Sequence, residues 1–224
     1  MRFVSWVSLL TFSLATVLST QVQASEGVSL DRTRIVIDGG KVEESLGVIN
    51  HLKHPVLVQT SFLNASLENS SAFLASPPLY RLDAQRSNRV RVVKVESLPD
   101  DVESVFWVQV TFVPTTSIDV QQKVGLGYGQ RIKLFYRPKN LQGDCQYVAD
   151  HLQWNYKDGI LSVKNPTKLS ISMLRLEIDG KRVNADMVMP QSNFEWKLPN
   201  VKSQQFSFKY LDEYGGIRSK EVRF

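Results

Sequence analysis

The side chains best suited to catalysis or metal binding do not form a recognisable site. An acidic cluster is formed by Asp100, Asp101 and Glu103. A glycosidase-type pair needs a second carboxylate across a cleft, and nothing in the sequence places one opposite this cluster. The histidines are His51, His54 and His151. Their spacing is not that of metal ligands, and no second cluster completes a site. We therefore predict that the protein is not an enzyme and that it holds no metal and no cofactor.

One glycine-rich segment, residues 125–129, is superficially similar to a phosphate-binding loop. Its glycine spacing differs from that of a nucleotide-binding loop. It also leads into the strand-like residues 132–136 and not into the N-terminus of a helix, where a phosphate would bind. We exclude nucleotide binding for this segment.

The same segment carries a row of apolar side chains. Val124, Leu126 and Tyr128 occupy every second position, so in a strand they lie on one face, and the residues between them are glycines. Such a row ordinarily faces the core of its own domain. Strands avoid glycine, because it adds no packing and costs backbone entropy, so the glycines indicate the alternative, close approach of another chain. The residues alone leave both interpretations open.

The elements that carry these residues are predicted to be strands, because apolar residues alternate with period two almost everywhere and helical spacing lasts no more than about a turn. Candidate strands are residues 33–38, 45–50, 56–63, 89–95, 105–113, 124–136, 152–156, 160–164, 169–178, 194–198, 205–211 and 217–224. Proline, glycine and polar residues interrupt this pattern at 137–143. We predict an all-β protein with immunoglobulin-like sandwiches at residues 25–138 and 139–224.

Residues 1–24 have the features of a secretory signal peptide. Arg2 precedes an apolar run at 3–18, and small and polar residues follow at Val22-Gln23-Ala24. Polar residues interrupt the run, which disfavours an uncleaved membrane anchor. We expect an exported protein that begins near Ser25.

The charge and the cysteine content exclude further functions and structural features. The formal net charge is +5, but there is no long run of Lys or Arg and no recognition-helix pattern, so we expect no nucleic-acid binding. Cys145 is the single cysteine, which excludes an internal disulfide. It is either a free reactive thiol or an inert small apolar residue.

Pro77 and Pro78 break the strand pattern, and the state of their peptide bonds, cis or trans, stays open.

Several segments together resemble one known family, the periplasmic chaperones of chaperone/usher pili. They are residues 28–34, Ser76-Pro77-Pro78, residues 132–138, residues 163–167, Met189-Pro190 and residues 213–216. The resemblance implies two immunoglobulin-like domains in an L or boomerang arrangement. The short connection from Pro114 to Lys123 resembles the short-loop branch of the family.

The resemblance also implies a function. Such a protein works in the periplasm, where it binds, folds and caps pilus subunits by donor-strand complementation and delivers them to an outer-membrane usher. It needs no cofactor. Self-association of the free protein stays open, because a second copy could cover an exposed apolar row.

By position, Arg34 and Lys133 match the basic residues that anchor the subunit's C-terminal carboxylate in the family. Val124, Leu126 and Tyr128 match the side chains of the donated strand. Lys133 has the opposite strand parity to that row, so a regular strand would direct it to the other face.

A further set resembles the family's inter-domain ion cluster. It consists of Glu103, Arg137 and Glu213, with Glu213 preferred to Asp212 because it directly precedes Tyr214. The alternative function is a secreted adhesion or carbohydrate-binding module. That module would expose aromatic residues, for which the candidates are Trp107, Trp154 and Trp196.

Overall fold

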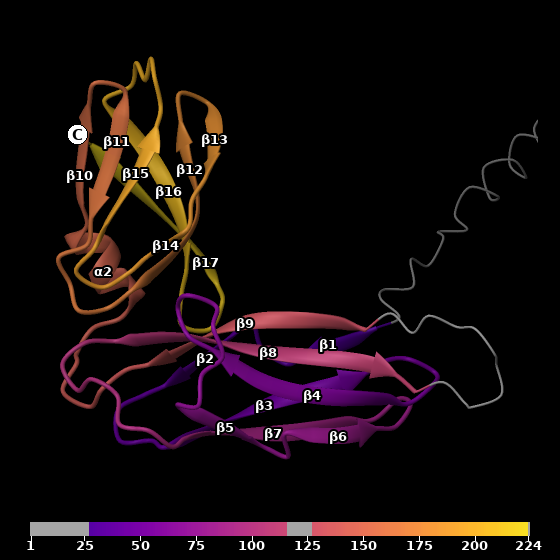
Figure 1. Ribbon diagram of the computed structural model, residues 1–224. Helices are drawn as coiled ribbons and strands as arrows, with labels where there is room; N and C mark the ends of the chain where they lie inside the picture. Colours follow the sequence, from indigo (N-terminus) through magenta and orange to yellow (C-terminus); the bar gives the residue numbers. More distant parts are fainter. Residues whose placement is uncertain (1–26, 116–126, 224) are drawn as a thin grey trace, which may run out of the picture.

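The computed structural model describes residues 27–115 and 127–223, whose regular elements are all strands apart from one short helix. The chain forms two β-sandwiches, and the second stands across one end of the first so that the molecule has the shape of an L (Figure 1). The predicted fold class is therefore confirmed. Within the described ranges, no helix is long and apolar enough to cross a membrane.

The first domain packs two sheets against each other. Its strands are β1 (Val28–Leu30), β2 (Arg34–Ile37), β3 (Glu43–Asn50), β4 (Val56–Leu63), β5 (Phe73–Ser76), β6 (Leu79–Leu82), β7 (Ser87–Lys94), β8 (Ser104–Pro114) and β9 (Tyr128–Tyr136). One sheet has the order β1-β3-β7-β5 and the other β2-β9-β8-β4-β6. Inward-facing residues of both sheets, including Ile35, Leu46, Val90 and Phe112, are fully buried. Each such side chain stabilises the fold by about 1.5–3 kcal/mol.

The second domain repeats this plan with a smaller core. Its strands are β10 (Gln153–Lys157), β11 (Ile160–Lys164), β12 (Ile171–Ile178), β13 (Lys181–Asn184), β14 (Met187–Val188), β15 (Asn193–Lys197), β16 (Gln205–Leu211) and β17 (Ile217–Arg223). One sheet has the order β10-β11-β15; the other has the order β13-β12-β16-β17, with β14 also paired to β12. Leu161, Leu176 and Phe208 are fully buried between the sheets.

A short helix, α2 (Cys145–His151), lies at the junction of the domains and was not predicted (Figure 1). The Asp144 side chain caps it by accepting a hydrogen bond from the Tyr147 N–H at 2.8 Å. Val148 and Ala149 are its buried residues. A helix of two turns cannot display a repeating apolar stripe, so the cap was the available sequence signal.

The double proline lies where the chain passes from one sheet of the first domain to the other. β5 pairs with β7 in the first sheet, and β6 pairs with β4 in the second. The Ser76–Pro77 peptide bond between these strands is cis. This answers for Pro77 the question that the sequence left open.

Candidate functional site

Two cations lie side by side on neighbouring strands of the first domain. β2 and β9 run parallel, and their register pairs Arg34 directly with Lys133. Ile35 and Leu134, the next residues along, face the sandwich core, so alternation directs the two cations to the opposite face, toward the second domain. The sequence placed these residues about a hundred positions apart, and the parallel pairing brings them together.

Within the described residues neither Arg34 nor Lys133 forms an ion pair, although the charge of Glu213 acts on Arg34 and that of Asp186 acts on Lys133. Only 8% of Arg34 is exposed, and its buried Nε has no hydrogen-bond partner within the described residues. The Lys133 ammonium donates to the Ser172 hydroxyl of the second domain at 3.4 Å and lies 5.5 Å from the ring centroid of Trp107. Burial lowers the pKa of both cations, and for Lys133 the nearby Arg34 charge lowers the pKa further. Such a pair is suited to an incoming anion, above all a carboxylate with two acceptor oxygens.

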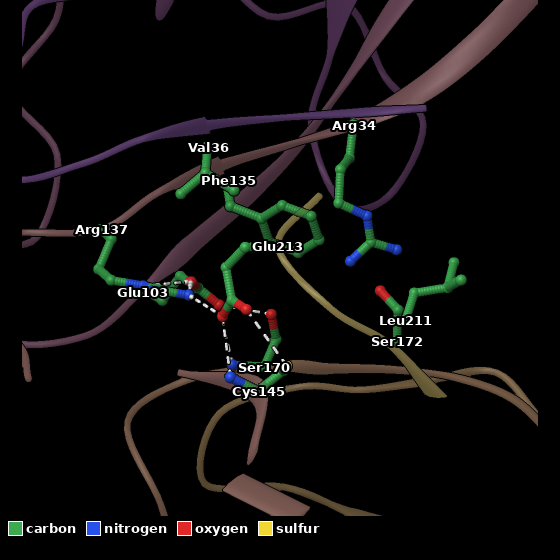
Figure 2. Close-up of a pocket in the computed structure, with 10 residues that line it drawn as sticks. All are labelled: Arg34, Val36, Glu103, Phe135, Arg137, Cys145, Ser170, Ser172, Leu211 and Glu213. Atoms are coloured by element: carbon green, nitrogen blue, oxygen red, sulfur yellow. Dashed lines mark hydrogen bonds and ion pairs between the residues drawn. The ribbon is translucent and has the colours of Figure 1, made fainter. Parts of the chain in front are cut away.

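A second set of charges joins the two domains. The Arg137 guanidinium donates to one oxygen of Glu103 at 3.1 and 3.2 Å and to Glu213 at 3.4 Å (Figure 2). The other Glu103 oxygen accepts the Ser170 N–H at 2.8 Å and the Ser170 hydroxyl. The Glu103 side chain is 1% exposed, so this network is shielded from solvent. Removing one partner from such a buried pair typically costs about 3–5 kcal/mol.

The second domain's contribution to this joint is shaped by a buried amide. Asn165 is fully buried, and its NH2 group donates to the carbonyls of Leu169 and Met189 at 2.7 and 3.0 Å. Its carbonyl oxygen accepts the Thr167 N–H at 3.0 Å. These bonds hold the loop before β12, which presents Ser170 to the first domain.

Glu213 lies in the tight turn between β16 and β17. The neighbouring Asp212 forms that turn by accepting the N–H groups of Tyr214 and Gly216 at 3.0 and 2.7 Å. The turn fits closely against the first domain, because a Cβ added at Gly215 would lie 2.4 Å from the Thr33 hydroxyl. Asp212 therefore shapes the turn, and Glu213 makes the inter-domain contact.

Cys145 belongs to the same network, which the sequence did not indicate. Its backbone N–H donates to one oxygen of Glu213 at 2.8 Å, and its thiol donates to the other at 3.2 Å. Burial and the Glu213 carboxylate raise the pKa of this thiol to about 12. The thiol therefore stays protonated at neutral pH and is a hydrogen-bond donor with little nucleophilic character.

Of the predicted apolar row, Tyr128 lies within the described residues, and Val124 and Leu126 lie outside them. The Tyr128 ring packs 5.3 Å from the ring of Phe112, and its hydroxyl accepts the Val28 N–H at 3.0 Å. The side chain is nevertheless exposed, with 40% of its surface accessible.

Tyr128 and Lys133 lie on opposite faces of β9. This strand pairs with β8 without a register shift from Tyr128 to Tyr136, so Tyr128 shares a face with Ile132 and Leu134, and Lys133 faces the other way. β9 contains no bulge between Tyr128 and Lys133 that would turn Lys133 to the face of Tyr128. A ligand that contacts both would lie along the strand edge and reach Lys133 from the side of the second domain.

The remaining candidates from the sequence are the possible metal ligands and the tryptophans. Within residues 27–115 and 127–223, no group of three or more His, Cys, Asp or Glu side chains could hold a metal ion. The tryptophans of the alternative binding module are packed: Trp154 stacks on Trp196 at 6.0 Å, and Trp107 lies under Lys133.

Comparison with known proteins identifies the family. Residues 27–142 match the family described as "Pili and flagellar-assembly chaperone, PapD N-terminal domain", and residues 147–222 match "Pili assembly chaperone PapD, C-terminal domain". The probable fimbrial chaperone LpfB of Escherichia coli O157:H7 is 34% identical over 210 residues, which cover 91% of this chain and 90% of that protein. Chaperone protein FimC of Escherichia coli K12 is 27% identical over 88% of this chain and 84% of its own length.

Solved structures agree with this. The crystal structure of the Escherichia coli chaperone DraB matches with a TM-score of 0.79 and 32% identity, covering 88% of this chain and 98% of that chain. A chain from the complex of the Salmonella enterica SafA pilin with the SafB chaperone matches with a TM-score of 0.81 and 26% identity, covering 89% of this chain and 97% of that one. This protein therefore belongs to the PapD family of pili assembly chaperones.

Proposed function

We propose that the protein is a periplasmic chaperone that binds, folds and caps pilus subunits and delivers them to an outer-membrane usher. Its action is binding without catalysis. Residues 1–24 are its removed export signal, and the mature protein consists of domains at 25–138 and 139–224. The short connection from Pro114 to Lys123 in the sequence supports its assignment to the short-loop branch.

The observation that carries this proposal is the unneutralised pair of cations facing the second domain. Arg34 and Lys133 lie in register, and the ion cluster at the joint fixes the second domain beside them. They receive the subunit's C-terminal carboxylate. Charge-assisted hydrogen bonds to that carboxylate contribute about 1.5–3 kcal/mol each.

The edge of β9 supports a strand-pairing role. β2 pairs with β9 over Lys133–Tyr136, and no strand of the described residues pairs with that edge of β9 before Lys133. A subunit strand whose carboxylate ends at Arg34 would continue the line of β2 and pair parallel to β9. The anchored carboxylate thus fixes the register, since a slip of one residue would turn every side chain to the wrong face.

The apolar row then fills the subunit's open groove. Val124, Leu126 and Tyr128 are the donated side chains, and each contributes about 1.5–3 kcal/mol when buried. At roughly 3.3 Å per residue, Tyr128 lies about 17 Å from the anchor at Lys133. The joint and the donated strand together determine which subunit segment fits.

The test captures the tagged mature protein from its native periplasm and identifies what co-purifies. The wild type should retain small subunits with an incomplete sandwich, and Lys133→Ala should lose them. Lys94→Ala is a matched control, because Lys94 also lies over an aromatic ring, 5.0 Å from the Tyr136 centroid, on a different sheet. Absence of subunits from the wild type would refute the function, and full retention by Lys133→Ala would refute the anchor.

A further inference from the structure

The basic pair has a carboxylate of its own chain close by. Arg34 and Glu213 line the same small cavity, of ≈ 20 Å³, between the domains. Glu213 is the strongest of the negative charges that act on Arg34. Figure 2 shows the Glu213 carboxylate directed toward Arg137 and Cys145, away from the Arg34 guanidinium. An internal carboxylate thus lies beside a site that must stay free for a foreign one.

The two oxygens of Glu213 are held differently. Oε1 accepts from Arg137 at 3.4 Å and from the Cys145 backbone N–H at 2.8 Å. Oε2 accepts from the Cys145 thiol at 3.2 Å, which is its one donor among the described residues. The orientation of the carboxylate therefore depends on a side chain that can be replaced without altering Arg137 or the backbone.

We propose that Cys145 is a positioning residue, whose thiol proton holds Glu213 on the joint and so keeps Arg34 vacant for the subunit's terminal carboxylate. This inference rests on the proposed anchor at Arg34 and Lys133. The thiol suits the task, because its raised pKa of about 12 keeps the proton in place throughout the physiological range.

Loss of the thiol leaves Oε2 without a donor among the described residues, in a side chain that is 22% exposed. Arg34, whose buried Nε also lacks a partner within the described residues, lines the same cavity. Rotation of the Glu213 side chain would satisfy both groups at once. Arg34 would then be occupied by its own chain, and affinity for any other carboxylate would fall in proportion to the vacant fraction. If Glu213 occupied Arg34 about nine-tenths of the time, the affinity would fall about tenfold.

The experiment uses the whole mature protein and follows the Arg34 Nε–Hε signal by ¹H–¹⁵N NMR, with N-acetylglycine as the probe. N-acetylglycinamide, which lacks the carboxylate, is the control ligand. In Cys145→Ala the ligand-free Arg34 signal should move toward its carboxylate-bound position, and N-acetylglycine should bind about tenfold more weakly. Cys145→Ser retains a donor and should resemble the wild type.

The double variant Cys145→Ala/Glu213→Gln separates positioning from a structural role. A neutral amide does not compete for Arg34, so the double variant should regain the wild-type Arg34 signal and affinity. Equal loss of affinity in the single and double variants would overturn the inference, as would an unchanged Arg34 signal in Cys145→Ala. A wild type that does not prefer N-acetylglycine to N-acetylglycinamide would instead refute the anchor, while the ligand-free Arg34 signal would still test the role of Cys145.

Discussion

Replacement of Glu103 by alanine should open the joint between the domains. The Glu103 side chain is 1% exposed and accepts from Arg137 and Ser170, so its removal leaves a shielded guanidinium and a buried N–H with fewer partners. Breaking one partner of such a pair costs about 3–5 kcal/mol. Glu103 belongs to neither hydrophobic core, so we expect this loss to fall on the contact between the domains.

Cys145 reports the opening, because it is the single cysteine and lies in the joint. Its thiol is protonated and bonded to Glu213 when the joint is closed, so a thiol-specific reagent should react from the open state. The labelling rate then follows the opening equilibrium. Since 1.4 kcal/mol corresponds to a tenfold change, Glu103→Ala should label about 10²- to 10⁴-fold faster at neutral pH.

Glu177→Ala is the matched control for this experiment. Glu177 also contacts several cations, among them Arg175 at 2.9 Å, but its side chain is 32% exposed. Exposed ion pairs contribute about 0–1 kcal/mol, so labelling of Cys145 should change by about fivefold at most. Labelling of Glu103→Ala at the rate of the wild type or of this control would refute the reasoning about the joint.

Three further predictions follow from the same geometry. Because burial places the folded-state pKa of Lys133 below 10.5, the unfolded chain binds the proton more tightly, so this group should make folding more favourable as pH rises from its folded pKa to 10.5. Over that interval N-acetylglycine binding should weaken as Lys133 loses its charge, and a Lys133→Arg variant that weakens equally would contradict this assignment. Tyr128→Phe removes the acceptor of a β1 N–H and should lower the free energy of unfolding by about 0.5–1.5 kcal/mol in urea, with subunit capture retained. Gly215→Ala should destabilise more than Gly180→Ala in the same assay, because both have positive φ but an added Cβ at Gly180 meets open space; equal losses would argue against the close fit of the turn.

Much of the fold could be predicted from the sequence. Alternation of apolar residues is a local signal, and it located long strands such as β4 and β8 because one face of each is buried. The family signature at 132–138 and the residues at 213–216 likewise indicated Lys133, Arg137 and Glu213 before any contact was known. Among the short elements, β5, β6 and α2 were not predicted: β5 and β6 have four residues each and flank the double proline, and α2 has two turns, so apolar spacing gives each of them a weak signal.

The sequence by itself thus determined the strand pattern, the two-domain plan and the two basic residues of the proposed carboxylate-binding pair. The tertiary structure decided which groups meet. The parallel register of β2 with β9 puts Arg34 beside Lys133, and the β16–β17 turn brings Glu213 to Arg137 and Cys145. These contacts depend on strand register and on the packing of one domain against the other. They join residues far apart in the chain, so they produce no periodic pattern in the sequence.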